Sequence, residues 1–240
     1  MHKAIAIGLA AATLASPGCA RDRTESAGPA TTRNYQVGAF DRLEVAGPYE
    51  VTVATGAAPS VRASGGEQAI EQLLVEVARG TLKIHSKKRS GMNFGWSRDH
   101  SVKVTVTVPN LSAADISGSG TISVDKVAGQ SFEGGIAGSG GLRVGHVDVK
   151  RLRVGIAGSG GFSGVGRAAV AEYDIAGSGD LNAPGLVAET AAVSIAGSGN
   201  VKAQATGTAK VDIAGSGNVR LTGGAKCSVS KLGSGNVDCL

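Results

Sequence analysis

Apolar and polar residues alternate along most of the second half of the chain, as they do in strands with one buried face. The segment AKVDI, residues 209–213, is followed after a short turn by NVRL, residues 218–221. Val211 and Ile213 are expected to face a core, and Asp212 the solvent. One unit is therefore predicted to be a strand, a tight turn, a second strand and a variable return.

The turn between these strands is Gly-Ser-Gly, which occurs seven times at intervals of 18 to 20 residues. Repeats of this period indicate a solenoid, in which each rung buries its apolar residues only against its neighbours. A sharp turn needs positive φ, which glycine adopts at little steric cost. The predicted turn glycines are Gly118, Gly120, Gly138, Gly140, Gly158, Gly160, Gly177, Gly179, Gly197, Gly199, Gly215, Gly217, Gly233 and Gly235.

These repeats predict an all-β chain, folded as a right-handed parallel β-helix or solenoid. The regular rungs cover residues 111–240, and a less regular β-rich part covers 39–110. In that part, residues 66–74 are the only helical candidate and Arg79-Gly80 is expected to turn a hairpin. Residues 39–110 are either separate layers or irregular first rungs, and we expect one continuous domain over 39–240.

The asparagines Asn200, Asn218 and Asn236 each follow a turn directly, and Asp180 takes that place one unit earlier. Stacked asparagines form amide ladders in parallel, in-register strands. We therefore expect the turns to have a collective structural role, and no chemical role peculiar to one serine.

The order of segments resembles a known family. It consists of FDRLEVAGPYEVTV (40–53), LLVEVARGTLKIHS (73–86), VKVTVTVPNLSAADISGSG (102–120) and successive IAGSG turns. This order resembles the GIN-domain family, whose members are described as auto-transporter adhesin heads within a class of domains of unknown function. The resemblance covers residues 39–240 and implies an exported bacterial β-helix protein, often a lipoprotein. It implies no activity and no catalytic residues.

The N-terminus has the features of an export signal. An apolar run at 4–15 follows a positive charge and is too short to span a bilayer, so residues 1–18 are predicted to be a signal peptide. Cys19 follows a glycine, as in bacterial lipoproteins, and is the predicted lipidation site; cleavage after Ala20 is the alternative. Residues 19–38 are expected to be a flexible tether. The predicted location is periplasmic or outer-membrane-associated, with the lipid as the only membrane contact.

The chain has three cysteines. If Cys19 carries lipid, Cys227 and Cys239 remain as a pair in an oxidising compartment. Alignment with Ala209 and Leu221 places both at inward positions of the last rung. We therefore predict a disulfide that locks the end of the solenoid.

Composition and spacing argue against several kinds of chemistry. The formal charge is +5 but the positive residues are dispersed, and aromatic residues make up 3%, so no nucleic-acid partner is expected. The serines lack the Gly-x-Ser-x-Gly elbow, the glycines lack the dinucleotide fingerprint, and no aspartate recurs as in calcium-binding repeats. Asp115, Asp174 and Asp212 precede isoleucines on well-separated rungs, which indicates a solvated face. No catalytic residue, cofactor or metal is predicted.

The least repetitive segment, KKRSGMNFGWSRDH at residues 87–100, contains Met92, Phe94 and Trp96 among basic residues. Aromatic residues on a loop are typical interaction anchors, so this segment is a candidate binding loop. Alternatively, it covers the open end of the core or is an excursion without a binding role.

The sequence as a whole favours an exported, non-enzymatic solenoid of the cell envelope. Its expected role is binding or adhesion to an unknown envelope or surface ligand, either glycan or protein, or a purely structural one. The alternative is a carbohydrate-active β-helix enzyme, a polysaccharide lyase or hydrolase, which would need a cluster of acids on one face.

Overall fold

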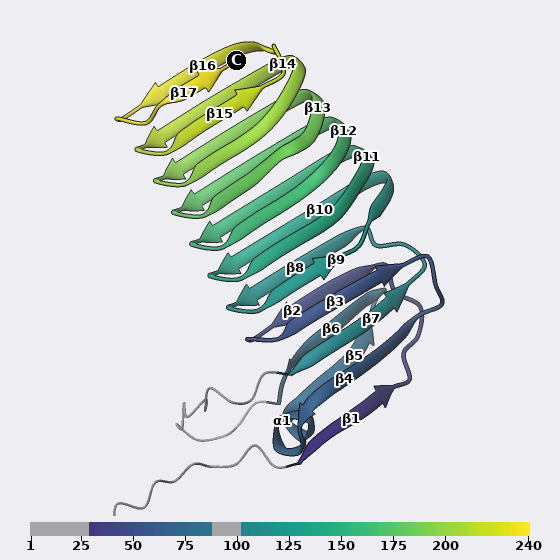
Figure 1. The fold of residues 1–240 in the computed structure, drawn as a ribbon. Coiled ribbons are helices and arrows are strands. Elements are labelled where there is room, and N and C mark those ends of the chain that lie inside the picture. Colours follow the sequence, from purple (N-terminus) through teal and green to yellow (C-terminus); the bar gives the residue numbers. More distant parts are fainter. Residues whose placement is uncertain (1–28, 88–101) are drawn as a thin grey trace, which may run out of the picture.

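The computed structural model describes residues 29–87 and 102–240. Within these ranges, seventeen strands form one hydrogen-bonded sheet, accompanied by one short helix. Figure 1 shows the sheet wound into a stack of flattened coils, with tight corners along one side and wider bends along the other. The fold is a parallel β-solenoid, as the repeat predicts. No helix in the described ranges is long and apolar enough to cross a membrane.

The regular part of the stack begins at residue 113. Its strands are β8 (Ala113–Gly118), β9 (Thr121–Val124), β10 (Val127–Gly138), β11 (Gly141–Gly158), β12 (Gly161–Gly177), β13 (Asp180–Gly197), β14 (Asn200–Gly215), β15 (Asn218–Thr222), β16 (Lys226–Leu232) and β17 (Val237–Cys239). Each of β11 to β14 runs from one corner to the next, so the predicted variable return is part of one long, bent strand. Parallel register places equivalent residues side by side, as with Ile136, Ile156 and Ile175.

The alternation of apolar and polar residues predicts the buried face correctly. The isoleucines before the first six corners are at most 3% exposed. The apolar residues two positions after the same corners are buried to the same degree. Full burial of such an aliphatic side chain contributes about 1.5–3 kcal/mol. The aliphatic columns inside the coil are therefore the main source of its stability.

The two glycines of a corner are required for different reasons. Gly215 has a φ of +135°, and a Cβ there would lie 2.1 Å from the carbonyl oxygen of Gly197 on the preceding rung. Gly217 does not have positive φ, but a Cβ there would lie 2.6 Å from the oxygen of Gly199 and 2.8 Å from Cγ2 of Ile195. Positive φ is the expected reason for glycine at both positions, but it applies only to the first glycine of the corner. At the second glycine, the close approach of the neighbouring rung leaves no room for a side chain.

The N-terminal part belongs to the same sheet. Its elements are β1 (Ala30–Tyr35), β2 (Arg42–Ala46), β3 (Glu50–Thr55), β4 (Ser60–Gly66), α1 (Glu67–Gln72), β5 (Leu73–Ala78), β6 (Thr81–Ser86) and β7 (Lys103–Val108). The helix and the hairpin turn lie where the sequence predicts them, with positive φ at both Arg79 and Gly80.

Two rungs of this part stack out of sequence order. Strands β2 and β3 pair in parallel with β8 and β9 on one side, and with β6 and β7 on the other. The corner at Gly47 between β2 and β3 lies beside the first Gly-Ser-Gly corner, and its N–H donates to the oxygen of Ser117 at 2.9 Å. Residues 42–108 therefore include irregular rungs of the same solenoid.

Antiparallel strands close the N-terminal end of the stack. Strand β4 pairs with β7, and β5 with β6, in the direction opposite to the parallel rungs. Helix α1 connects β4 to β5, and the side chain of its Ile70 is completely buried. The stack of parallel rungs therefore ends here in a different kind of layer.

The predicted tether of residues 19–38 is wrong over its last part. Residues 30–35 form β1, which pairs antiparallel with β4 from Ala30 beside Gly66 to Tyr35 beside Val61. Most side chains of β1 are exposed, so backbone hydrogen bonds hold the strand and its polar sequence does not show an apolar period. Residues 19–28 of the predicted tether lie outside the described ranges.

Replacing corner residues should separate the roles of glycine and serine. Gly215→Ala should lower the free energy of unfolding by about 2 kcal/mol or more, because it combines positive φ with a contact too short for a Cβ. Ser216→Ala should change it by about 0.5 kcal/mol or less, since Ser216 is exposed. Urea denaturation measures both, and equal losses would contradict this account of the corner.

Tyr173 tests the cost of a polar atom in the aliphatic core. Its side chain is 1% exposed, its hydroxyl has no hydrogen-bond partner among the described residues, and burial raises its pKa. An unsatisfied buried polar group costs about 1–3 kcal/mol, so Tyr173→Phe should raise the free energy of unfolding by about 1 kcal/mol or more. Tyr35→Phe is the comparison: its hydroxyl is also without a partner among the described residues, but Tyr35 as a whole is only half-buried, so the effect should be smaller. A destabilised Tyr173→Phe variant would show that the hydroxyl is satisfied in solution.

Candidate binding surface

The face that follows the corners carries a polar ladder, which we define as Asp180, Asn200, Asn218 and Asn236. These residues stand directly after four successive corners, and the parallel register places each beside the next. Nδ2 of Asn200 donates to Oδ1 of Asp180 at 2.8 Å, and Nδ2 of Asn218 donates to Oδ1 of Asn200 at 3.0 Å. The backbone N–H of Asn236 donates to Oδ1 of Asn218 at 3.2 Å. The predicted amide ladder is therefore formed by Asn200 and Asn218, and it continues to the carboxylate of Asp180 and to the backbone of Asn236.

A second outward column runs two residues further along each strand. It consists of Asn182, Lys202, Arg220 and Asp238, and Arg220 reaches Asp238 at 3.5 Å. Together with the polar ladder, it borders a shallow groove of about 580 Å³. Each ladder amide bonded along the stack has a second N–H and a second oxygen lone pair. The groove therefore offers donors and acceptors repeated at the rung spacing of roughly 4.8 Å.

The face before the corners has a different character. The outward position before each isoleucine is glycine at Gly135 and Gly155, and a groove of about 520 Å³ crosses them. A Cβ at Gly135 would lie 2.2 Å from Oδ1 of Asp115, so the Asp115 carboxylate occupies the space beside Gly135 that a side chain would otherwise fill. Burial raises the pKa of Asp115, and the charge of Arg42 partly opposes the rise.

Ion pairs join neighbouring rungs on the outside of the coil. Nε of Arg153 donates to Oε2 of Glu172 at 2.9 Å, and Arg167 contacts Asp148 at 2.9 Å. The hydrogen bond from Arg167 lowers the pKa of Asp148. Solvent screens exposed pairs of this kind, so they contribute little to stability.

Asp115 and Asp174 do not form the close pair that glycoside hydrolysis uses. Glu44 lies beside Asp115 on the adjacent rung, but Lys83 pairs with Glu44 at 2.8 Å. Asp115 and Asp174 are three rungs apart, which is roughly 14 Å at the ordinary strand spacing. Retaining and inverting glycosidases hold their carboxyl groups about 5–9.5 Å apart. In the described ranges, no group of three or more His, Cys, Asp or Glu residues could hold a metal ion.

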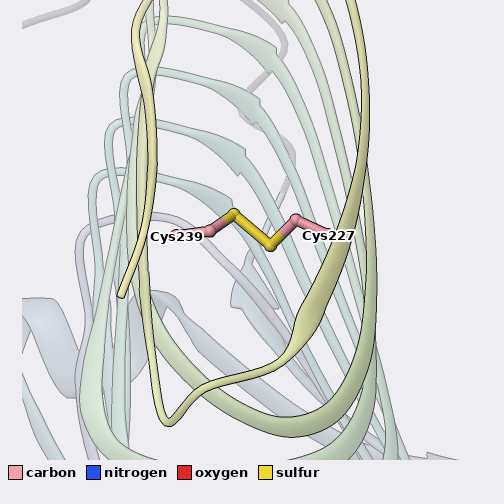
Figure 2. Close-up of a disulfide and its surroundings, with 2 residues drawn as sticks. All are labelled: Cys227 and Cys239. Carbon is pink, nitrogen blue, oxygen red and sulfur yellow. A yellow bond between two sulfur atoms is a disulfide. The ribbon is translucent and has the colours of Figure 1, made fainter.

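The last rung contains a disulfide between Cys227 and Cys239, with an S–S distance of 2.10 Å and a Cα–Cα distance of 6.6 Å (Figure 2). The register places Cys227 beside Ala209 and Cys239 beside Leu221. Both are inward positions, so the bridge crosses the interior of the coil at its open end.

Four sequence-predicted site residues lie outside the described ranges: the lipidation candidate Cys19 and the loop residues Met92, Phe94 and Trp96. Sequence reasoning did not single out the column of Lys202 and Arg220 or the pairs between rungs. The spacing of 18 to 20 residues could have found them, because a residue and its equivalent one unit later are neighbours in a parallel stack.

Comparison with known proteins agrees with this architecture. Residues 39–225 match the family described as "Putative auto-transporter adhesin, head GIN domain". The chain belongs to this family. The match includes the GIN-domain rungs through β15 and ends before β16. No curated protein matches the chain.

Solved structures share the GIN-domain fold at low sequence identity. A putative adhesin from Bacteroides fragilis NCTC 9343 has a TM-score of 0.80 at 21% identity, over 88% of this chain and 97% of its own. A putative lipid binding protein from Parabacteroides distasonis ATCC 8503 has a TM-score of 0.69 at 24% identity, over 89% and 97%. A putative adhesin from Parabacteroides merdae ATCC 43184 has a TM-score of 0.68 at 19% identity, over 89% and 97%. These similarities establish the fold.

The polar ladder can be tested as a source of stability. Asn218→Ala removes two hydrogen bonds, one to each neighbouring rung, and should lower the free energy of unfolding by about 1–2 kcal/mol. Asn182→Ala is the matched control, because Asn182 is an exposed asparagine beside the ladder that takes no part in its bonds. Chemical denaturation measures both, and an equal effect of the two changes would show that the ladder bonds add nothing.

Proposed function

We propose that this GIN-domain protein is an exported, non-enzymatic binding protein that attaches to a glycan through the groove beside the polar ladder. The observation that carries the proposal is the ladder itself, a carboxylate and three side-chain amides that follow successive corners and offer donors and acceptors at the rung spacing. A polymer that presents hydroxyl groups at regular intervals can bond to several rungs at once.

The chemistry of the groove supports a glycan over an apolar ligand. Its outward rim is made of amides, the cations of Lys202 and Arg220, and the carboxylates of Asp180 and Asp238. An extended peptide lying along the stack would repeat its backbone groups on one side every two residues, at roughly 6.6–6.8 Å, which does not match the rung spacing of roughly 4.8 Å. The description of the family as adhesin heads is consistent with attachment.

The proposal extends to the location of the protein. A positive N-terminus, an apolar run at 4–15 and Cys19 favour export and lipid anchoring at an envelope membrane. The anchor would hold the chain by its N-terminal side, where α1 and β1 lie, and would leave the ladder rungs at the far end of the stack (Figure 1).

A glycan array with the full-length protein, lipidated or released, tests this function. We expect binding to extended polysaccharides, and a loss of about tenfold or more in the double variant Asn200→Ala/Asn218→Ala. Arg153→Ala on the opposite face is the control and should bind normally. Binding that survives the double variant would contradict the ladder as the site, and turnover of a bound polysaccharide would contradict the non-enzymatic role.

A further inference from the structure

The last rung, β16 and β17, departs from the pattern of the rungs beneath it. Lys231 takes the register position of the buried Ile213, and its Nζ donates to the carbonyl oxygen of Gly235 at 2.8 Å. In the described ranges, three of the four exposed large apolar side chains belong to this end: Val229 is 47% exposed, Leu232 77% and Leu240 67%. The rung therefore leaves apolar surface open while placing a charge where the stack would continue.

That charge makes the intact end a poor partner for another copy of itself. Two copies of β16 could pair antiparallel about Val229, which keeps inward residues inward. Lys231 of each copy would then lie at an inward position opposite Cys227 of the second copy. Inward-pointing charges are a known device against pairing of sheet edges, because burying the charge is costly.

The rung beneath has no such protection. Strand β14 turns Ala209, Val211 and Ile213 inward, and β16 covers its edge only from Thr208 to Ala214. Antiparallel pairing of two copies of this segment about Val211 keeps the apolar residues inside. In each copy, Lys210 would then lie opposite Asp212 of the other copy, which makes two such pairs. Opposite charges across neighbouring strands stabilise a sheet.

We propose that the last rung is a disulfide-locked cover over this edge, and that reduction of Cys227–Cys239 converts the monomer into an end-to-end dimer. A dithiol reductant transfers two electrons and two protons, so the S–S bond breaks, two thiols form and the dithiol becomes its own disulfide. Cys239 is exposed, so a reductant can reach the bond. Once released, the short rung loses its anchor across the coil and the edge of β14 becomes free.

The architecture limits this association to two copies. Pairing of the same edge on both copies is isologous and closes on itself. A filament would need the C-terminal end of one copy to stack on the N-terminal end of the next. That end is formed by the antiparallel strands β1, β4 and β5, with α1 between β4 and β5.

Light scattering coupled to size exclusion tests the proposal on the full-length protein. The oxidised protein should have the mass of a monomer. Treatment with dithiothreitol, and separately the variant Cys227→Ser/Cys239→Ser, should double the mass while circular dichroism retains its β signal. A mass that stays at the monomer value, growth beyond the dimer, or loss of the β signal by both routes would each overturn the proposal.

Charge reversal identifies the edge. In the Cys227→Ser/Cys239→Ser background, Asp212→Lys should abolish the dimer, because Lys210 would then face a lysine. Adding Lys210→Asp should restore it, since the pair is then reversed but complementary. Asp238→Lys, an acid away from the edge of β14, is the control and should leave the dimer intact. A dimer that survives Asp212→Lys would show that another surface forms it.

Discussion

The approach of one rung to the next at the corners is the constraint on which the rest of this molecule depends. Carbonyl oxygens of one corner lie where a Cβ of the next would be, so only glycine permits the strand spacing to continue through the turn. Serine N–H groups then donate across the gap, as Ser216 does to Gly197 at 2.9 Å. With the corners in register, equivalent residues stack automatically. The buried isoleucines, the polar ladder and the ion pairs between rungs are all consequences of that stacking.

The local pattern predicts the regular half of the fold well, because residues paired between rungs there are separated along the chain by one repeat. The position of β2 and β3 could not be predicted in this way, since their partners β6 to β9 come from distant segments and no repeat marks the pairing. Strand β1 was not predicted from the sequence for a different reason. Its stability comes from backbone bonds to β4, which leave no trace in the order of apolar residues.

The candidate surface was predictable to the same extent. Three asparagines at a fixed place after the corner are enough to predict the ladder. The groove beside it also depends on Lys202 and Arg220, whose neighbours become clear only with the register of the strands. The raised pKa of Asp115 could not be predicted from the sequence. It arises from burial on a face where glycines leave room for the side chain to lie against the backbone.

The displaced rung of β2 and β3 has a consequence for how the chain acquires its structure. In the regular half, each strand meets a partner about twenty residues away, so rungs can be added one after another. Strand β2 must wait for β8, whose paired residues are 71 positions further along the chain. Closing that distance carries a larger entropic cost, and such non-local pairing slows folding. During synthesis from the N-terminus, β2 and β3 would therefore stay half-paired until residue 124 has been added.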